Sequence, residues 1–347
     1  MKINVLYQTK KGPWGGGNQF VVALTKYLNR FNQYAQNPKN ADAILFNLNP
    51  SASLPMLLSR LKTIKNQHPN KLVFCRIDGP VYLVRNKDLD LDRAFYRFIC
   101  ALSDGVIFQS NWSRQNNYNF GLKHHEFEKV IMNASDPNIF NRHGKIPFSN
   151  QRKTRLIMTS WSSNWRKGFE IYKWLDQCLN FDIFELTFAG NTPTTFSNIK
   201  HIPPLDSEKL AELLKYHDIY LTASQKDPCS NALIEALSCG LPSLAKDDGG
   251  HPEIVGNGGA LFQDPHEIPG LLNNIINNYN TYQNNIHVQT MYHIGKQYVD
   301  FMHDIYEKVL SKKYTPKFFS NRNYMPVYGR VFCWQLKNKI LSIYNAF

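Results

Sequence analysis

Residues 227–253 read DPCSNALIEALSCGLPSLAKDDGGHPE, and the rest of the chain is best interpreted outward from this stretch. It joins an Asp-Pro turn to a short apolar helix that carries one carboxylate, Glu235. A Gly-Leu-Pro break then leads into a strand, and a Gly-Gly loop precedes Glu253. Two acids on either side of a helix N-terminus can meet the hydroxyls of a sugar, a ribose and a diphosphate. The stretch therefore predicts a sugar-nucleotide site in an α/β fold.

The helix expected over residues 230–239 has a narrow polar face. Asn231, Glu235 and Ser238 are spaced at i, i+4 and i+7, which places them on one side of a helix. The face either lines a cleft or lies in water, and the scarcity of Lys and Glu favours the cleft. Glu235 would then accept hydrogen bonds from both ribose hydroxyls. The N–H groups of residues 229–231 would face a diphosphate, with Ser230, Asn231 and Ala232 as donor contacts.

Strand and helix patterns alternate on both sides of this stretch. Short apolar runs at residues 3–7, 43–46, 72–75, 106–108 and 130–132 are separated by helical patterns. After a polar segment at 144–155, strands are expected at 156–159, 186–189, 219–221 and 241–245. This alternation predicts an α/β protein with two Rossmann-like, doubly wound domains that face a central cleft. We expect domains at 1–148 and 149–290, followed by C-terminal helices and a tail at 291–347.

Three further loops follow predicted strands and could serve the site. Arg166 and Lys167 precede Gly168 in a strand-to-helix loop, where two cations would neutralise charge developing on a diphosphate leaving group. Gly15, Gly16 and Gly17 open a helix and form either a mobile loop or a lip that approaches the donor closely. Asp78 ends another strand, where it would act on an acceptor hydroxyl or cap a turn before Gly79-Pro80.

The composition restricts the class of protein. The net charge of +13 calls for acidic partners, and nucleotide phosphates, nucleic acid and an anionic membrane face are the choices. No nucleic-acid module is recognisable, so we expect no nucleic-acid partner. The six scattered cysteines and the absence of a signal-peptide pattern indicate a cytoplasmic protein. The D-x-D pattern in residues 88–92 lies at a predicted helix start, where acids are expected anyway, so we assign it no metal.

The last tenth of the chain carries about half of the excess charge. Residues 312–347 contain seven basic residues and no acid. A helix expected from residue 328 has an apolar stripe that consists of Phe332, Leu336, Ile340, Tyr344 and Phe347. This tail either packs back on the N-terminal domain or attaches the protein to the inner face of an anionic membrane.

Six segments, in this order, resemble the retaining GT-B glycosyltransferases of family 4. They are the GGG loop (15–17), IMNASDPNIF (131–140), the RKG loop (166–168), DIYLTAS (218–224), DPCSNALIEALSCGLP (227–242) and GGHPEIV (249–255). The likeness spans most of residues 1–310.

The resemblance implies transfer of a sugar from a nucleotide-diphosphate-sugar donor to a hydroxyl of a glycan or lipid-linked acceptor. It implies retention at the anomeric carbon without an essential metal or a cofactor. Carried over, Lys167 and Arg166 would bind the diphosphate and Glu235 the ribose. Asp227 stands where the family usually has Glu and would hold the donor sugar, and Asp78 matches the family's pattern only loosely. A nucleotide-sugar epimerase and a catalytically inactive relative are the alternatives.

Overall fold

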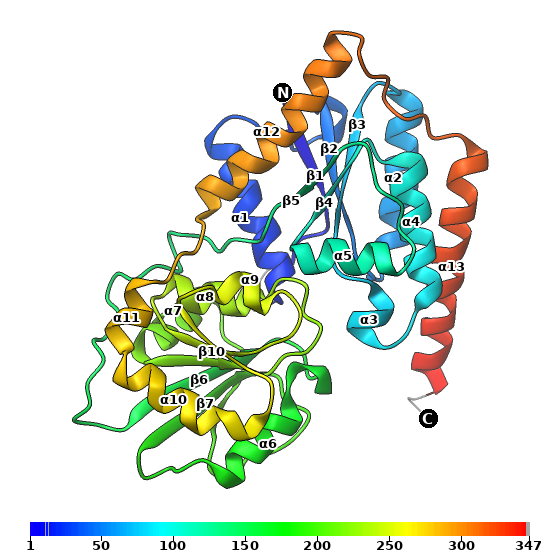
Figure 1. Cartoon of the computed structure of the whole chain (residues 1–347). Coiled ribbons are helices and arrows are strands. Elements are labelled where there is room, and N and C mark those ends of the chain that lie inside the picture. Colours follow the sequence, from blue (N-terminus) through cyan, green and yellow to red (C-terminus); the bar gives the residue numbers. More distant parts are fainter. Residues whose placement is uncertain (11, 13, 345–347) are drawn as a thin grey trace. The chain divides into compact units, whose positions relative to one another are not determined.

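The computed structural model describes residues 1–10, 12 and 14–344, with side chains described up to residue 340. The chain forms two compact units. The first consists of residues 1–8, 24–132 and the chain from residue 294 onward, and the second of residues 9–23 and 133–293. Each unit contains one parallel β-sheet flanked by helices (Figure 1), which confirms the predicted α/β class with two parallel sheets.

The sheet of the first unit has five strands in the order β1-β2-β3-β4-β5. They are β1 (Ile3–Leu6), β2 (Ala43–Leu48), β3 (Leu72–Ile77), β4 (Gly105–Phe108) and β5 (Glu128–Val130). The backbone of Ile3 also bonds to Gln33 and Ala35 on the side of β1 away from β2. The chain therefore reverses direction across the sheet at β1, as a doubly wound fold does.

Helices cover both faces of this sheet (Figure 1). They are α1 (Gly16–Arg30), α2 (Leu54–Gln67), α3 (Val81–Arg85), α4 (Leu89–Leu102), α5 (Asn111–Asn119), α12 (Met291–Leu310) and α13 (Asn321–Tyr344). On one face, Gly295 of α12 lies against the ring of Tyr27 in α1, where a Cβ would come within 2.4 Å of that ring. On the other face, α2, α4 and α13 bury a shared apolar core.

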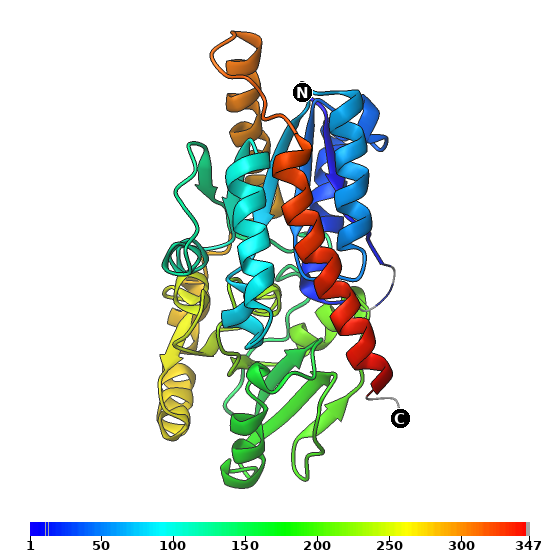
Figure 2. The same ribbon diagram turned by 90° about the vertical axis from the view of Figure 1, so that its right-hand side faces the viewer.

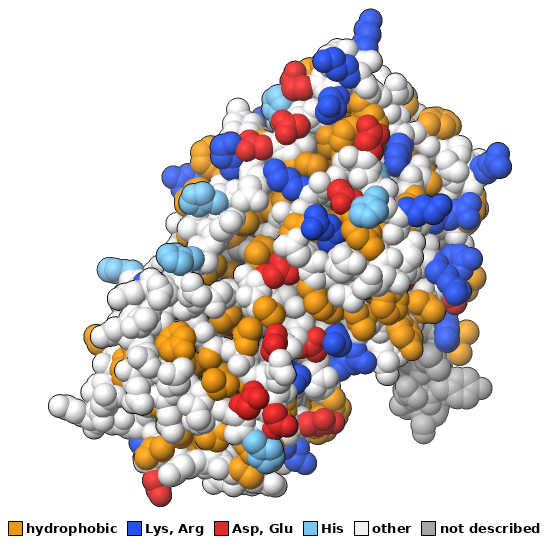
Figure 3. All heavy atoms as spheres, viewed as in Figure 1, with side chains coloured by type: hydrophobic (Ala, Val, Ile, Leu, Met, Phe, Trp, Pro, Cys, Tyr) orange, Lys and Arg blue, Asp and Glu red, His pale blue; other side chains and the backbone are white. Residues whose placement is uncertain are grey.

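The C-terminal helix α13 packs along α2 and α4 (Figure 2). Tyr324, Val327 and Val331 form its buried face. The predicted apolar stripe is not this face, because Phe332, Leu336 and Ile340 are exposed. The stripe's Tyr344 and Phe347 lie outside the residues whose side chains are described. The helix is therefore apolar on two sides, and only one of them contacts the unit. In the space-filling view, Lys, Arg and hydrophobic side chains lie side by side along the edge where α13 runs (Figure 3).

The connection between α12 and α13 is bonded firmly to the first unit. Asp104, which is fully buried, accepts hydrogen bonds from the Tyr314 hydroxyl at 2.9 Å and the Lys317 N–H at 2.7 Å. Phe319 is buried beside Phe98, with 6.0 Å between the ring centroids. These contacts attach the start of α13 to the core of the first unit.

The sheet of the second unit has six strands in the order β11-β10-β9-β6-β7-β8. They are β6 (Thr154–Ser160), β7 (Phe184–Gly190), β8 (Lys200–Ile202), β9 (Ile219–Thr222), β10 (Ser243–Lys246) and β11 (Gly259–Phe262). Its helices are α6 (Phe169–Cys178), α7 (Ser207–Tyr216), α8 (Asn231–Ser238), α9 (His251–Val255), α10 (Ile268–Asn277) and α11 (Tyr279–Asn284). The chain starts this sheet at β6, builds outward to β8, and then returns to place β9 on the other side of β6.

The core of the second unit is aromatic near α6. Phe169 and Tyr172 of α6 pack against Phe188 of β7, at centroid distances of 5.5 Å and 6.0 Å. The tyrosine hydroxyl accepts the N–H of Ala223 just beyond β9, at 3.1 Å. Helix α6 follows β6, and Ala223 follows β9. These contacts therefore fix the loops after β6 and β9, the two neighbouring strands at which the strand order reverses. Among the residues that the structure describes, no helix combines the length and apolar character needed to cross a bilayer.

Candidate functional site

The candidate site lies at the carboxyl ends of β6 and β9, within the second unit. Strand order reverses between these two neighbours, and doubly wound sheets bind ligands at such a reversal. The loop after β6 contains Arg166 and Lys167, and the loop after β9 contains Asp227. The backbone N–H of Gln225 donates to the Arg166 carbonyl at 2.7 Å, which joins the two loops directly.

The loop after β6 is shaped by its glycine. Residues 165–167 form a single 3₁₀ turn, and the Asn164 side chain accepts the Arg166 N–H at 2.9 Å. Gly168 then has a φ of +94°, a left-handed conformation that glycine adopts without steric cost. A Cβ there would lie 2.5 Å from the Cβ of Ala223. This close approach brings Lys167 to the end of β9.

Lys167 and Asp227 form an ion pair in which Nζ lies 2.8 Å from Oδ2. The other carboxylate oxygen of Asp227 accepts the Cys229 N–H at 3.3 Å. Burial alone would raise the pKa of Asp227, but Lys167 and the Cys229 N–H together hold that pKa below its usual value. Asp227 is therefore an anion at neutral pH. The Cys229 N–H, which we expected to face a diphosphate, is instead used by Asp227.

The backbone of Asp227 is braced by the Gly-Gly loop that follows β10. The Gly250 N–H donates to the Asp227 carbonyl at 2.8 Å. Gly249 has a φ of +67°, and a Cβ on it would lie 2.3 Å from the same carbonyl oxygen. Asp248 accepts the Nζ of Lys226 at 2.9 Å and its N–H at 3.2 Å. Thus the GG pair of the sequence pattern supports the backbone of Asp227.

Helix α8 carries Glu235 one turn beyond its start. Ser230 caps the helix by accepting the Leu233 N–H at 3.4 Å. The Glu235 side chain is 8 % exposed, and burial raises its pKa to about 8. Of the predicted polar face, Glu235 lines a cavity, whereas Ser238 accepts a hydrogen bond from the Ser135 hydroxyl at 3.0 Å. The face is therefore only partly a ligand-facing surface.

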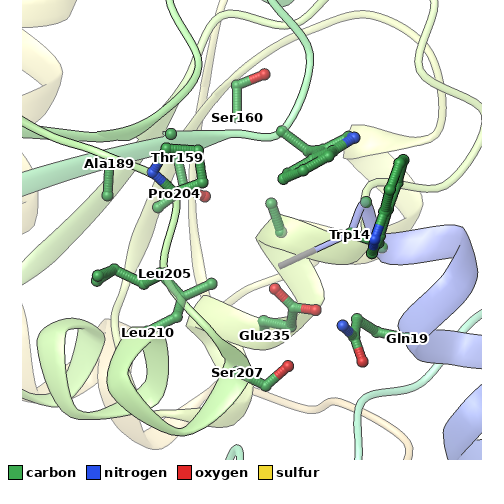
Figure 4. A pocket seen from close by; sticks show the side chains of 15 residues that line it. Trp14, Gln19, Thr159, Ser160, Ala189, Pro204, Leu205, Ser207, Leu210 and Glu235 are labelled. Carbon is green, nitrogen blue, oxygen red and sulfur yellow. The ribbon is translucent and has the colours of Figure 1, made fainter. Parts of the chain in front are cut away.

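The cavity beside Glu235 has a polar end and an apolar end. In the close-up view, the Glu235 carboxylate points toward Gln19 and Trp14, while Pro204, Leu205 and Leu210 line another wall (Figure 4). The remaining lining comes from residues 15, 16, 159–161, 189, 190, 207 and 232. A flat apolar ring and a ribose diol are the ligand groups that match such a cavity.

Two tryptophans and the glycine loop form part of the cavity lining. The rings of Trp14 and Trp161 are 5.3 Å apart at 45°. Gly16 packs so closely on Asn231 that a Cβ would lie 2.3 Å from the asparagine Cβ. The predicted donor contacts Gly16, Ala232 and Glu235 are thus brought together. Gly17 does not line the cavity, and no heavy atom lies within 4 Å of the Cβ it would have.

Asp78 lies in the first unit, at the carboxyl end of β3. Its carboxylate accepts a hydrogen bond from Gln109 and lies 3.7 Å from the Arg76 guanidinium. Its carbonyl accepts hydrogen bonds from Ser113 and Asn117 of α5, at 3.0 Å and 2.9 Å. The side chain is 43 % exposed, so it can reach a ligand.

Two acids of the D-x-D pattern, Asp90 and Asp92, have structural partners. Asp92 is buried and accepts the N–H groups of Val81 and Tyr82 at 2.6 Å and 2.9 Å, and Asp90 lies 3.5 Å from Arg330 of α13. Among the described residues, no group of three or more His, Cys, Asp or Glu side chains has the arrangement of a metal site.

Sequence reasoning missed several residues of the site. Trp14 lies just before α1 and Gln19 in its first turn, and Trp161 follows β6. Ser224 follows β9, and its hydroxyl donates to Asp227 Oδ2 at 3.4 Å. His251 is buried, and its Nδ1 donates to the Lys246 carbonyl at 2.9 Å. Burial lowers the pKa of His251, so its ring is neutral at neutral pH. The positions of Trp161 and Ser224 just after predicted strands could have indicated that they belong to the site. The residue types gave no such indication, because Trp, Gln and Ser are not typical markers of a nucleotide site.

Comparisons with known proteins agree with this geometry. The family model described as glycosyl transferases group 1 matches residues 197–287, which include Asp227 and Glu235. A comparison with curated protein sequences finds no significant match.

Solved structures with the same fold cover most of the chain. Sucrose-phosphate synthase from Thermosynechococcus elongatus is 16 % identical, with a TM-score of 0.60 over 86 % of this chain and 79 % of that one. Anabaena HepE in complex with UDP and glucose is 16 % identical, with a TM-score of 0.63 over 90 % and 100 %. WaaG, a glycosyltransferase involved in lipopolysaccharide biosynthesis, is 12 % identical, with a TM-score of 0.62 over 86 % and 99 %.

At these identities the likeness to the solved structures establishes the fold. The chain has the GT-B architecture of these glycosyltransferases, and its residues 197–287, which hold Asp227 and Glu235, match glycosyl transferases group 1.

Proposed function

We propose that the protein is a retaining, metal-independent glycosyltransferase. It would take a sugar from a nucleoside-diphosphate sugar and pass it to a hydroxyl of a glycan or of a lipid-linked acceptor in the cytoplasm. HepE, whose structure holds UDP and glucose, makes uridine donors the first to test.

The observation that carries this proposal is the Lys167–Asp227 ion pair, because Asp227 lies just before the N-terminus of α8, the helix that carries Glu235. In a nucleotide sugar, the diphosphate and the sugar hydroxyls are adjacent groups. A cation and an anion that touch each other fit that junction, with Lys167 on the phosphate and Asp227 on a hydroxyl. Glu235 follows Asn231 by four residues, about 6 Å along the helix, which is a suitable offset for a ribose.

The same groups support a charge-stabilised reaction. The bond between the anomeric carbon and the phosphate oxygen breaks, and the acceptor oxygen bonds to that carbon on the same face. The acceptor's proton passes to the departing phosphate oxygen. Lys167 and Arg166 would stabilise the negative charge that develops on the diphosphate.

Asp78 is the first-unit residue that we propose to contact the acceptor. Its carboxylate is half-exposed at a strand end, and its bonds to Gln109 and its proximity to Arg76 fix its orientation. It would accept a hydrogen bond from an acceptor hydroxyl. Asp78→Asn should therefore raise the KM for acceptor more than the KM for donor.

The proposal is tested by incubating the protein with a panel of nucleotide sugars and following the release of the nucleoside diphosphate. Slow hydrolysis of one donor in the absence of acceptor is expected, because water can replace the acceptor hydroxyl. Lys167→Ala and Glu235→Ala should each remove most of this release although the variant proteins are still folded at the assay temperature. Undiminished release in both variants would refute the assignment of the site.

A further inference from the structure

Helix α13 presents a second apolar face away from the core it covers. Met325, Phe332, Leu336 and Ile340 are 54 %, 43 %, 45 % and 55 % exposed. Their spacing of 7, 4 and 4 residues keeps them within an arc of about 80° at about 100° per residue. The stripe is about 22 Å long at about 1.5 Å per residue. Water-exposed apolar residues normally occur singly, so a stripe of four indicates an interaction surface.

Basic side chains border this stripe. Arg322, Lys337 and Lys339 are exposed on α13, and the whole segment 312–347 has seven basic residues and no acid. Figure 3 shows Lys and Arg side chains next to hydrophobic ones along this edge. An apolar stripe flanked by cations, on a helix that lies on a protein rather than crossing a bilayer, is the pattern of an interfacial membrane helix.

The charge decides between the possible occupants. A second copy of the chain would bring two segments of the same strong positive charge together, which disfavours self-association through α13. A nucleic acid would match the charge but not the four apolar side chains. An anionic lipid surface matches both, because headgroups attract the cations and the acyl boundary accepts the apolar stripe.

We propose that the exposed face of α13 docks the protein on an anionic lipid surface. The buried face of the helix and the bonds of Tyr314 and Lys317 to Asp104 fix α13 to the first unit. Docking of α13 would therefore hold the whole first unit at the membrane. This surface does not depend on the transfer chemistry, so it can hold or fail independently of the proposed function.

Co-sedimentation with large unilamellar vesicles tests the proposal with the full chain. Binding is expected to vesicles of equal parts phosphatidylglycerol and phosphatidylcholine, and to be at least tenfold weaker with phosphatidylcholine alone. Lys337→Glu with Lys339→Glu should weaken binding roughly 30-fold or more, since each basic residue near a charged surface contributes about 1 kcal/mol. Binding that is equal on both vesicle types would overturn the proposal.

A matched pair of isoleucines separates the apolar stripe from general surface effects. Ile340 in α13 and Ile183 in the second unit are 55 % and 50 % exposed. Ile340→Glu should lower vesicle binding at least tenfold, whereas Ile183→Glu should leave it unchanged. Equal effects of the two variants would overturn the proposal. So would a shift from dimer to monomer caused by Ile340→Glu in sedimentation velocity, because the stripe would then be a protein interface.

A reporter on the helix keeps the test informative if Ile340→Glu unfolds α13. Cys333 is exposed on α13, and Cys100 and Cys178, which are also exposed, can be replaced by Ser. An environment-sensitive fluorophore on Cys333 should shift to the blue with anionic vesicles and return in high salt. An unchanged emission spectrum while the protein is bound to vesicles would place the contact elsewhere and overturn the proposal.

Discussion

Lys167 neutralises Asp227 in the structure, and a donor diphosphate would compete for the same ammonium group. If Lys167 stabilises the leaving group, Lys167→Ala should lower kcat about 10²- to 10³-fold, the usual effect of removing one charge-stabilising group. Lys173→Ala is the control, because Lys173 is exposed on α6 in the same unit. Steady-state rates of nucleotide release measure both. A loss of less than twofold in Lys167→Ala would show that the ammonium does not take part.

Glu235 gives the site a pH dependence. Burial raises its pKa to about 8, so in the empty site the carboxyl is mostly protonated at pH 7. Ribose hydroxyls donate best to the ionised form, so binding would lower this pKa and release a proton. Donor affinity should therefore rise up to about tenfold per pH unit below pH 8 and then level off. Calorimetric titrations across pH 6.5–8.5 measure this, and Glu235→Gln should bind weakly with no such rise.

The same pKa makes a prediction for stability. Because the native state holds the Glu235 proton more tightly than the unfolded chain, this residue's contribution to stability falls as pH rises from about 4.5 to about 8. Glu235→Gln should remove that fall and raise the melting temperature at pH 8 more than at pH 5. Glu208→Gln is the exposed control on α7. A gain in melting temperature that is equal at both pH values would contradict the raised pKa.

At the scale of elements, the turn at Gly249 decides where Asp227 lies. Gly249→Ala would force a Cβ to within 2.3 Å of the Asp227 carbonyl oxygen and into a φ of +67°. The turn would shift and move Asp227 away from Lys167, so donor affinity should fall about tenfold or more. Gly270→Ala in α10, where nothing lies within 4 Å of the added Cβ, should leave affinity unchanged. Equal affinities in the two variants would show that the brace does not position Asp227.

At the scale of the whole molecule, the chain's last segment is part of the first unit's core. Phe319 is 1 % exposed against Phe98, and its neighbour Phe318 is 65 % exposed. Phe319→Ala should lower the free energy of unfolding of the first unit by about 3–5 kcal/mol. Phe318→Ala should cost about 0.5 kcal/mol or less. Differential scanning calorimetry measures both, and a similar small effect of the two would mean that the segment does not support the unit.

The fold and the charged loops could be predicted from the sequence because the signals for both are local. Alternating strands and helices predicted two parallel sheets, and the glycine after Arg166-Lys167 predicted the turn that its positive φ now explains. Contacts between distant segments left no such signal. The periodicity of α13 revealed an apolar stripe, but not which of its two apolar faces the core would take. Likewise, Trp14 meets Trp161 only through tertiary packing. The bond from the Cys229 N–H to Asp227, by contrast, is a local turn that the sequence could have indicated.

The central claim is that the second unit binds a nucleoside-diphosphate sugar through Lys167 and Glu235. Isothermal titration calorimetry with UDP, GDP and ADP and their glucose conjugates tests this most directly on the wild-type chain and on Lys167→Ala and Glu235→Ala. The account predicts saturable binding of one nucleotide family, weakened at least tenfold in each variant. Binding of none of these ligands, or equal binding by the wild type and both variants, would contradict it.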